Sequence, residues 1–245
     1  MLVGPATHLF DYLHAIPKTY EATVRWGVET DNGDPQGDVT FLGDPAGLSA
    51  EQLNAALATF VGWQDQIPHA TSAKRVDGER AYIRVHRGEN VVMPPSRVYL
   101  HEAHWLSHDL PHESRLQITT RGGYYVRALA RDLGRLVGCG AHLTQLHRAA
   151  IGPWNDPGPD RVIEVHGRDL LSWAAARVLS DQDVGDLRRG ETIPLMKLIP
   201  PDWPVPAGFP DPEAPIRGLH QGRLVFFLRA EGFRLAATEE FRGGL

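Results

Sequence analysis

Arg127 is the charged residue whose position most needs a chemical explanation. Val126, Leu129 and Leu133 recur at helical spacing, so the sequence predicts a helix from Val126 onward. The dipole of such a helix disfavours a cation in its first turn. A positive charge placed there needs an anion close by, either a carboxylate or a phosphate. The alternative is an ordinary surface ion pair, which contributes little to stability.

This helix is the centre of a predicted strand, turn, helix, turn and strand over residues 117–148. Residues 117–120 favour extended backbone, and the glycine pair that follows permits a sharp turn. The apolar face of the helix is expected to reach Leu136, after which further glycines end the helix. Residues 141–148 are predicted to form the returning strand.

A second candidate binding segment, residues 66–87, is rich in cations and has no long apolar run. If this segment contacts RNA, its cations reach phosphates and Tyr82 offers a face for base stacking. A solvated surface loop is the alternative interpretation of the same composition. The candidate phosphate-binding residues of the segment are Lys74, Arg75, Arg80, Arg84 and Arg87.

Three ordered motifs resemble those of the TruB family of tRNA pseudouridine synthases. Residues 123–134 read Gly-x-Tyr-x-Arg-x-Leu-x-x-Asp-Leu-Gly, followed by Gly-Cys-Gly-Ala-His-Leu at 138–143. Residues 18–22 match the family's Lys-x-Tyr-x-Ala motif. The family's Pro-Pro-x-x-Ser-Ala-x-Lys-x-x-Gly-x-Arg-x-Tyr segment resembles the basic segment, with His69 in place of the second proline and Arg75 where lysine is usual. The resemblance covers roughly residues 1–154 and implies the pseudouridine synthase fold.

The resemblance implies an isomerase that converts a T-loop uridine of tRNA to pseudouridine (the pseudouridine-55 type) without a cofactor. The uridine must leave its stack and enter a pocket. Tyr20 would stack on the base and take part in proton transfer, although its position in a strand also suits a half-buried structural tyrosine. Arg127 would pair with the catalytic aspartate, and Leu143 and Tyr125 would line the base pocket.

The expected partner is therefore the T-stem-loop of tRNA. In addition to the cations of residues 66–87, the sequence offers three basic residues near the motifs as RNA contacts: Lys18, Arg121 and Arg148. RNA binding through such contacts is expected to weaken steeply with salt, because each phosphate contact releases counterions.

The catalytic aspartate of the family stands in a Gly-x-Leu-Asp-Pro-x-Ala-x-Gly motif, which the sequence lacks. In the family a strand ending in Val-Gly-x-Ala-Thr follows it, and residues 3–7 match that ending. The aspartate is thus expected about ten residues before Met1, which would fall within a core strand. Asp44, between a glycine and a proline, looks similar, but it follows Tyr20 instead of preceding it and is interpreted as a turn residue.

Two hypotheses follow from these motifs. The first is a TruB-type synthase whose start was assigned late or whose N-terminus was lost. The second is a catalytically inactive RNA-binding relative that still grips the tRNA elbow. Under either hypothesis residues 1–245 as written are predicted to have no synthase activity, because no positioned carboxylate would face Arg127.

The charge distribution is compatible with RNA binding although the formal net charge is −5. Residues 61–154 carry 12 basic and 8 acidic side chains, an excess of +4, and hold eight of the 12 histidines. Residues 1–60 carry 2 basic and 8 acidic side chains. A local basic patch is enough to bind phosphates, whatever the total charge.

Several classes of protein are not expected. The sequence has no apolar run of membrane-spanning length, no signal-peptide pattern and a single cysteine, so we expect a cytoplasmic protein without disulfides. His101, His104, His108 and His112 have no carboxylate or thiolate at the short fixed spacings that zinc sites prefer, so no metal is expected. Nothing in the sequence indicates obligate assembly, and we expect a monomer.

The predicted fold class is α+β, with a mixed, mainly antiparallel sheet and flanking helices over residues 1–154. Residues 155–245 are predicted to hold linker helices and a small β-rich, PUA-like module. The proline-dense residues 200–215 cannot form a regular element. Helices are predicted at 5–15, 49–61, 168–180 and 181–190, and strands at 18–28, 90–106, 218–220, 224–228 and 233–237.

Overall fold

The computed structural model describes residues 2–245, which fall into two compact units. One unit is Pro17–Ile151, and the other combines Met1–Ile16 with Gly152–Leu245. The N-terminal segment thus groups with the C-terminal part of the chain and not with the domain that the sequence placed at residues 1–154.

The unit Pro17–Ile151 is built on an antiparallel sheet in which strands follow the order β9-β1-β8-β7-β4. Strand β1 is central because it pairs with both β8 and β9. Two short ribbons, β2 with β3 and β5 with β6, complete the strands of this unit among the described residues. The bounds are β1 Lys18–Trp26, β2 Val28–Thr30, β3 Val39–Leu42, β4 Gly62–Gln66, β5 Arg75–Val76, β6 Glu79–Arg80, β7 Ser96–Asp109, β8 Glu113–Thr120 and β9 Ala141–Ile151.

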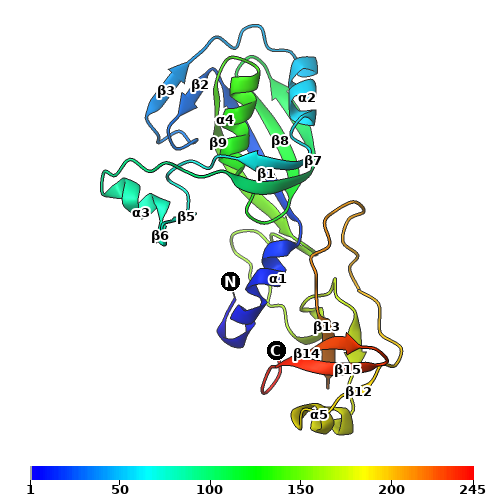
Figure 1. Ribbon diagram of the computed structural model, residues 1–245. Coiled ribbons are helices and arrows are strands. Elements are labelled where there is room, and N and C mark those ends of the chain that lie inside the picture. The colour runs from blue at the N-terminus through cyan, green and yellow to red at the C-terminus, as the bar shows by residue number, and fades with distance from the viewer. Residues whose placement is uncertain (1) are drawn as a thin grey trace. The chain divides into compact units, whose positions relative to one another are not determined.

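Helix α4 (Val126–Leu136) packs on one face of this sheet (Figure 1). Its buried residues Leu129 and Leu133 share a core with Val24 of β1 and Ile118 of β8. Helix α2 (Ala50–Ala58) contributes to the same core, while α3 (Ala81–His86) lies in the segment that carries β5 and β6. Leu136, which was predicted to be buried, is exposed because α4 ends at this residue.

Local signals set several of these boundaries. Ser49 and Gln52 form the predicted capping box at the start of α2. Strand β7 begins at Ser96, whereas the sequence predicted a strand from residue 90. The later start follows because Pro94 and Pro95 cannot donate hydrogen bonds to a sheet. The mixed α+β class predicted from the sequence is confirmed.

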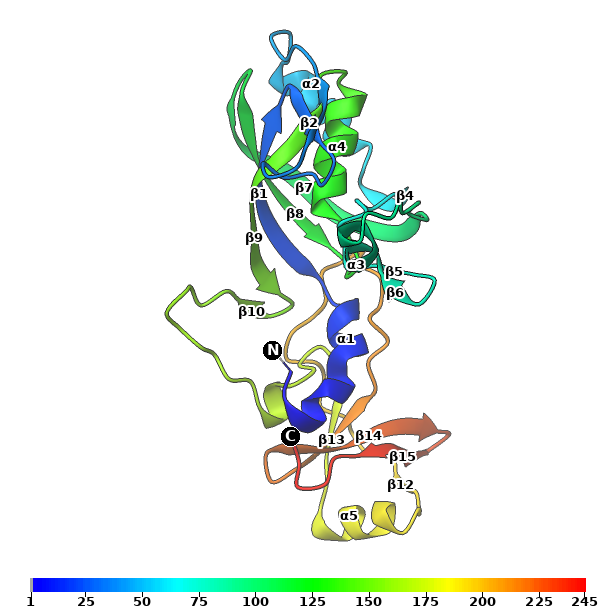
Figure 2. The same cartoon turned by 90° about the vertical axis from the view of Figure 1, so that its left-hand side faces the viewer.

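The other unit contains a second sheet with the strand order β11-β13-β14-β15-β12 (Figure 2). The three predicted C-terminal strands are therefore confirmed as β13, β14 and β15. The bounds are η1 Gly4–Leu9, α1 Phe10–Ala15, β10 Trp154–Asn155, η2 Gly167–Asp169, β11 Ala176–Val178, α5 Asp181–Arg188, β12 Ile193–Pro194, β13 Ile216–His220, β14 Arg223–Glu231 and β15 Arg234–Glu240.

Ring and polar contacts explain why the N-terminal segment belongs to this unit. The ring of Tyr12 meets Phe227 edge-on at 5.2 Å, and His8 lies 2.5 Å from a carboxylate oxygen of Glu239. The half strand expected around Met1 is not seen at the described residues Leu2 and Val3, which precede η1 without strand pairing; Met1 lies outside the described residues.

The helix predicted at 168–180 is wrong. Leu171 adopts a left-handed backbone with φ of 51°, which a continuous helix does not accept. Leu170, Leu171, Trp173 and Ala174 are all buried, so the apolar run fills a core from several sides and does not form one helical face. Helix α5, with its capping box at Ser180, and the irregular residues 200–215 agree with the predictions.

Candidate functional site

Arg127 forms an ion pair with Asp34. A guanidinium nitrogen, Nη2, lies 2.6 Å from the Oδ2 atom of Asp34, and the Asp34 side chain is only 15% exposed. The expectation that Arg127 requires an anion is therefore confirmed, and the anion is a carboxylate of the chain itself. The prediction that no positioned carboxylate faces Arg127 is wrong, because the turn between β2 and β3 carries Asp34 to the start of α4.

Several hydrogen bonds fix the turn that presents Asp34. Its backbone N–H donates to Asn32 Oδ1 at 2.9 Å, and its Oδ1 accepts from the backbone N–H of Gln36 at 3.1 Å. Its carbonyl accepts from the hydroxyl of Thr30 at 2.9 Å. One carboxylate oxygen thus holds the turn while the other faces Arg127.

The same turn is joined to the predicted pocket residue Leu143. The backbone N–H of Leu143, on β9, donates to the carbonyl of Gly33 at 3.0 Å. The Leu143 side chain is buried in the core of the unit. Arg127, Asp34 and Leu143 are therefore brought to one place by α4, the β2–β3 turn and β9.

Gly33 lies directly beneath two side chains of the site. A Cβ atom at Gly33 would come within 2.7 Å of His69 Cε1 and 2.9 Å of Arg127 Cβ, and the residue has a φ of +74°. His69 is 8% exposed, and burial together with Arg131 and Arg127 lowers the pKa of its imidazole to about 4. The imidazole is consequently neutral near pH 7.

Tyr20 and Lys18 lie on the face of β1 that α4 covers. The pattern follows from strand alternation, because Ala22 and Val24 of the same face are core residues and Tyr20 packs against that core. Burial raises the pKa of the Tyr20 hydroxyl, with Arg148 acting in the opposite direction. Arg148 stands directly opposite Tyr20 on β9.

Lys18 is a buried cation close to other cations. It is 8% exposed, and burial together with Arg148 and Arg121 lowers the pKa of its ammonium to about 8. The structure thus gathers three of the predicted RNA-contacting residues, Lys18, Arg121 and Arg148, near Tyr20. Positive charge concentrated in this way favours an anionic ligand.

Tyr125 is the residue before α4, and its main chain is held by Gln66. The backbone N–H of Tyr125 donates to Gln66 Oε1 at 3.0 Å, and Gln66 Nε2 donates to the Tyr125 carbonyl at 3.4 Å. Gln66 is almost fully buried at the end of β4. This amide therefore fixes the start of the helix that carries Arg127.

We call residues 67–95 the arm. Its cations are largely paired with other groups of the arm. Lys74 Nζ donates to the carbonyls of Pro94 and Pro95 at 2.7 and 3.0 Å. Arg84 pairs with Glu89 at 2.7 Å and Arg87 with Glu79 at 2.5 Å. Arg75 donates to Gly78 O, and Arg80 donates to the Tyr82 hydroxyl.

Sequence reasoning missed Asp34, Gly33, Gln66 and the burial of His69. One signal was present: Asp34-Pro35 is flanked by Gly33 and Gly37, which is the same pattern as the Asp44 segment. Asp44 itself caps a turn, accepting from the backbone N–H of Ala46 at 2.9 Å, as predicted.

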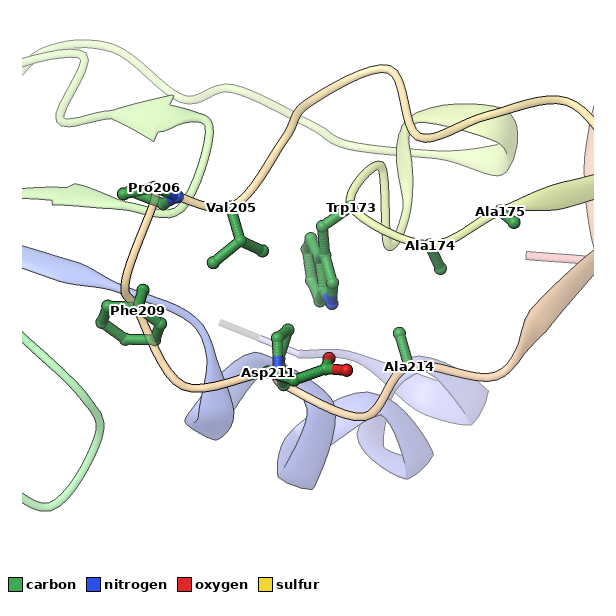
Figure 3. A pocket seen from close by; sticks show the side chains of 9 residues that line it. Trp173, Ala174, Ala175, Val205, Pro206, Phe209, Asp211 and Ala214 are labelled. Atoms are coloured by element: carbon green, nitrogen blue, oxygen red, sulfur yellow. The ribbon is translucent and has the colours of Figure 1, made fainter.

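Other possible sites lie elsewhere or are not found. A cavity of about 300 Å³ in the C-terminal unit is lined by Trp173, Phe209 and Asp211 among others, and none of the predicted site residues lines it (Figure 3). Within residues 2–245 no group of three or more His, Cys, Asp or Glu side chains is arranged to hold a metal ion. No helix in the described part of the chain has the length and apolarity needed to cross a membrane.

Two family models match residues 1–175 of the chain. Residues 1–126 match the model of the TruB family pseudouridylate synthase N-terminal domain, and residues 127–175 match that of the tRNA pseudouridylate synthase B C-terminal domain. The chain belongs to the TruB family. The Asp34–Arg127 pair and Leu143 thus lie within the matched TruB segments, as do Tyr20 and the arm.

Individual TruB relatives agree with this assignment. The chain is 39% identical over 156 residues to tRNA pseudouridine synthase B of Cutibacterium acnes, covering 62% of this chain and 53% of the relative. It is 31% identical over 228 residues to the protein of that name from Leifsonia xyli, covering 85% and 72%. The chain spans about half the length of most of the curated relatives it matches.

A solved structure with the same fold is the crystal structure of a Cbf5-Nop10-Gar1 complex. Its matching chain superimposes with a TM-score of 0.58 at 14% identity, covering 96% of this chain and 69% of that one. A second match, an H/ACA RNP bound to a substrate RNA containing 2′-deoxyuridine, gives a TM-score of 0.57 at 13% identity. At these identities the likeness shows the fold alone.

Proposed function

We propose that the chain is a tRNA pseudouridine synthase that isomerises a T-loop uridine to pseudouridine. The observation that supports this most directly is the Arg127–Asp34 ion pair at the start of α4, beside the backbone of Leu143. An arginine held in this way is ready to orient a carboxylate at a reacting sugar. The names of the relatives agree with the activity and with a tRNA substrate.

The reaction requires little beyond a pocket, a carboxylate and a proton acceptor. The N1–C1′ glycosidic bond breaks, the uracil rotates, a C5–C1′ bond forms, and the proton lost from C5 is balanced by one gained at N1. In our proposal Tyr20 stacks on the flipped uracil and assists removal of the C5 proton. Leu143 and Tyr125 line the base pocket. No cofactor takes part in the proposed reaction.

The nucleophilic carboxylate is a separate element of the proposal. The Gly-x-Leu-Asp-Pro-x-Ala-x-Gly motif of the family does not occur in residues 1–245. We assign Asp34 to positioning Arg127, because one Asp34 oxygen already accepts from the backbone of Gln36 and the other from Arg127. In this proposal the nucleophile is the aspartate of a segment that carries the family motif. Residues 1–245 tested by themselves are therefore expected to give no turnover.

The RNA surface in this proposal is the cationic region around the pocket. Lys18, Arg121 and Arg148 face the backbone near the target nucleotide, and the arm contacts the T-stem-loop through Arg75, Arg80 and Tyr82, with Lys74, Arg84 and Arg87 shaping the arm. We further propose that the protein acts as a monomer in the cytoplasm.

The test measures tritium released from an unmodified T-stem-loop that carries [5-³H]uridine. Residues 1–245 are compared with the same residues preceded by a segment that carries the family's Gly-x-Leu-Asp-Pro-x-Ala-x-Gly motif, which we call the extended protein. We expect turnover from the extended protein only, and loss of that turnover in Arg127→Ala. Turnover by residues 1–245 alone would overturn the role assigned to Asp34 and make it the candidate nucleophile.

The alternative function is RNA binding without catalysis, and it is favoured by the absence of the Leu-Asp-Pro motif from residues 1–245. An extended protein that binds the stem-loop but releases no tritium would support this alternative. An extended protein that neither binds nor reacts would contradict both functions.

A further inference from the structure

The arm begins with a cluster of polar side-chain atoms that have no partner. His69 Nε2, Thr71 Oγ1 and Ser72 Oγ are all covered from solvent, and none has a hydrogen-bond partner among residues 2–245. Covered polar groups in folded proteins are nearly always hydrogen-bonded, because leaving one unpaired costs about 1–3 kcal/mol. Three such atoms within four consecutive residues therefore need an explanation.

The cluster lies against the site described above. The imidazole edge of His69 packs beneath Gly33, beside the Cβ of Arg127. A turn in which Ser72 N–H donates to the His69 carbonyl at 3.0 Å keeps the three side chains together. His69 thus borders the residues that hold the Asp34 carboxylate, and the turn keeps Thr71 and Ser72 next to His69.

The chemistry of the cluster suits an uncharged contact to a sugar–phosphate backbone. Two hydroxyl groups can each donate or accept, and the neutral imidazole can do either according to its tautomer. In the proposed function Arg127 lies at the reacting sugar. His69, which is beside Arg127, is therefore nearer to the sugar than to the far edge of the base. Hydroxyl and imidazole groups are common partners of phosphate and ribose oxygens.

The arm has a small hydrophobic core of its own. Ala81, Val91 and Met93 form a small core of their own, joined by Val76 and Val85, and this core is separate from that of the sheet and α4. In Figure 1 the segment with α3, β5 and β6 stands away from α4. A segment with its own core can move without unpacking the sheet.

We propose that His69, Thr71 and Ser72 bind the sugar–phosphate of the nucleotide that enters the Arg127 site, after the root of the arm shifts to admit it. This inference rests on the proposed function and adds to it a set of positioning residues. The contacts are to the backbone and are therefore indifferent to the base. They also carry no charge, so they add nothing to the salt dependence of binding.

The test compares binding of two RNAs by residues 1–245: the T-stem-loop with its target uridine, and the same stem-loop with an abasic nucleotide at that position. The variants are His69→Phe, Thr71→Val and Ser72→Ala. Each should weaken binding about 2- to 10-fold for both RNAs alike, without changing the salt slope. Each should leave the unfolding midpoint unchanged or raised, because an unpaired polar atom is removed from the free protein.

The matched control is Ser172→Ala, since Ser172 Oγ is also covered and unpartnered within residues 2–245 but lies in the other unit. It should bind both RNAs like the unmodified protein. Affinity that is unchanged in all three arm variants, a loss confined to the uridine RNA, or a loss that tracks a lowered unfolding midpoint would each overturn the inference. If the unmodified protein still prefers the uridine RNA and Tyr20→Ala loses that preference, the proposed function survives that result. If no stem-loop binds, both fail.

Discussion

Asp34 and Arg127 approach each other to 2.6 Å although they belong to different elements of the unit, the turn of the β2–β3 ribbon and the first turn of α4. The carboxylate balances a cation that the helix dipole disfavours. The pair also places a fixed arginine beside Leu143, because the turn that carries Asp34 is hydrogen-bonded to the backbone of that residue.

Removing the charge of Asp34 should impair catalysis more than folding. Asp34→Asn keeps an oxygen for the backbone of Gln36 but weakens the hold on Arg127, so turnover of the extended protein should fall about 10- to 100-fold. Asp44→Asn is the matched control, because Asp44 also precedes proline and accepts from a backbone N–H two residues on. Tritium release that falls equally in both variants would contradict the assigned role.

Gly33 should be intolerant of a side chain. Gly33→Ala places a Cβ against His69 and Arg127 and imposes a left-handed backbone on alanine, so unfolding should become easier by about 2 kcal/mol or more. Gly78→Ala has a similar φ of +84° but open space around it, and should cost only about 1 kcal/mol. Denaturant titration of both variants measures the difference, and equal losses would show that the close approach at Gly33 is unimportant.

The ion pair between Glu29 of β2 and Arg135 of α4 should contribute to the free energy of unfolding. Glu29 is buried and accepts two hydrogen bonds from Arg135, at 2.6 and 2.9 Å. Glu29→Gln should therefore lower the free energy of unfolding by about 1–3 kcal/mol. Glu113→Gln, at the more exposed pair with Arg25, should cost less than about 1 kcal/mol. Similar losses in the two variants would rule out a special contribution from the buried pair.

Lys18 should give the protein a distinctive stability at alkaline pH. The folded pKa of about 8 lies below the ordinary lysine value of 10.5, so protonation favours the unfolded chain and the folded state gains stability as the pH rises from 8 towards 10.5. Relative to Lys18→Met, which cannot titrate, the gain should be on the order of 3 kcal/mol. If the difference in free energy of unfolding between the two proteins stays constant over this pH range, burial does not lower the pKa of Lys18.

The elements that the sequence predicted well are those with strong local signals. The α4 region followed from helical spacing between glycines, and the starts of α2 and α5 followed from capping boxes at Ser49 and Ser180. The prediction of a helix at 168–180 failed because the apolar residues satisfy helical spacing while the backbone is left-handed at Leu171. Burial on several sides cannot be distinguished from one helical face by spacing alone.

The site was predicted in part because its residues come from motifs that are far apart. Arg127, Leu143 and Tyr20 were found through the family motifs, and the need of Arg127 for an anion followed from the helix dipole. Which carboxylate meets Arg127 depends on how the β2–β3 ribbon places its turn, and the Gly-Asp-Pro-x-Gly pattern of Asp34 occurs again at Asp44. The ion pairs of Arg84 and Arg87 with Glu89 also depend on how the folded arm places these side chains, so the sequence did not predict them.

The central claim is that the face beside Arg127 binds a uracil, and base-dependent binding tests it most directly. The measurement is the affinity of residues 1–245 for the T-stem-loop with uridine and for the matched abasic stem-loop, before and after Tyr20→Ala. We predict that the unmodified protein prefers uridine by roughly 5- to 150-fold, the range of base stacking on one aromatic ring, and that Tyr20→Ala loses this preference. Equal affinity of the unmodified protein for the two RNAs would contradict the claim.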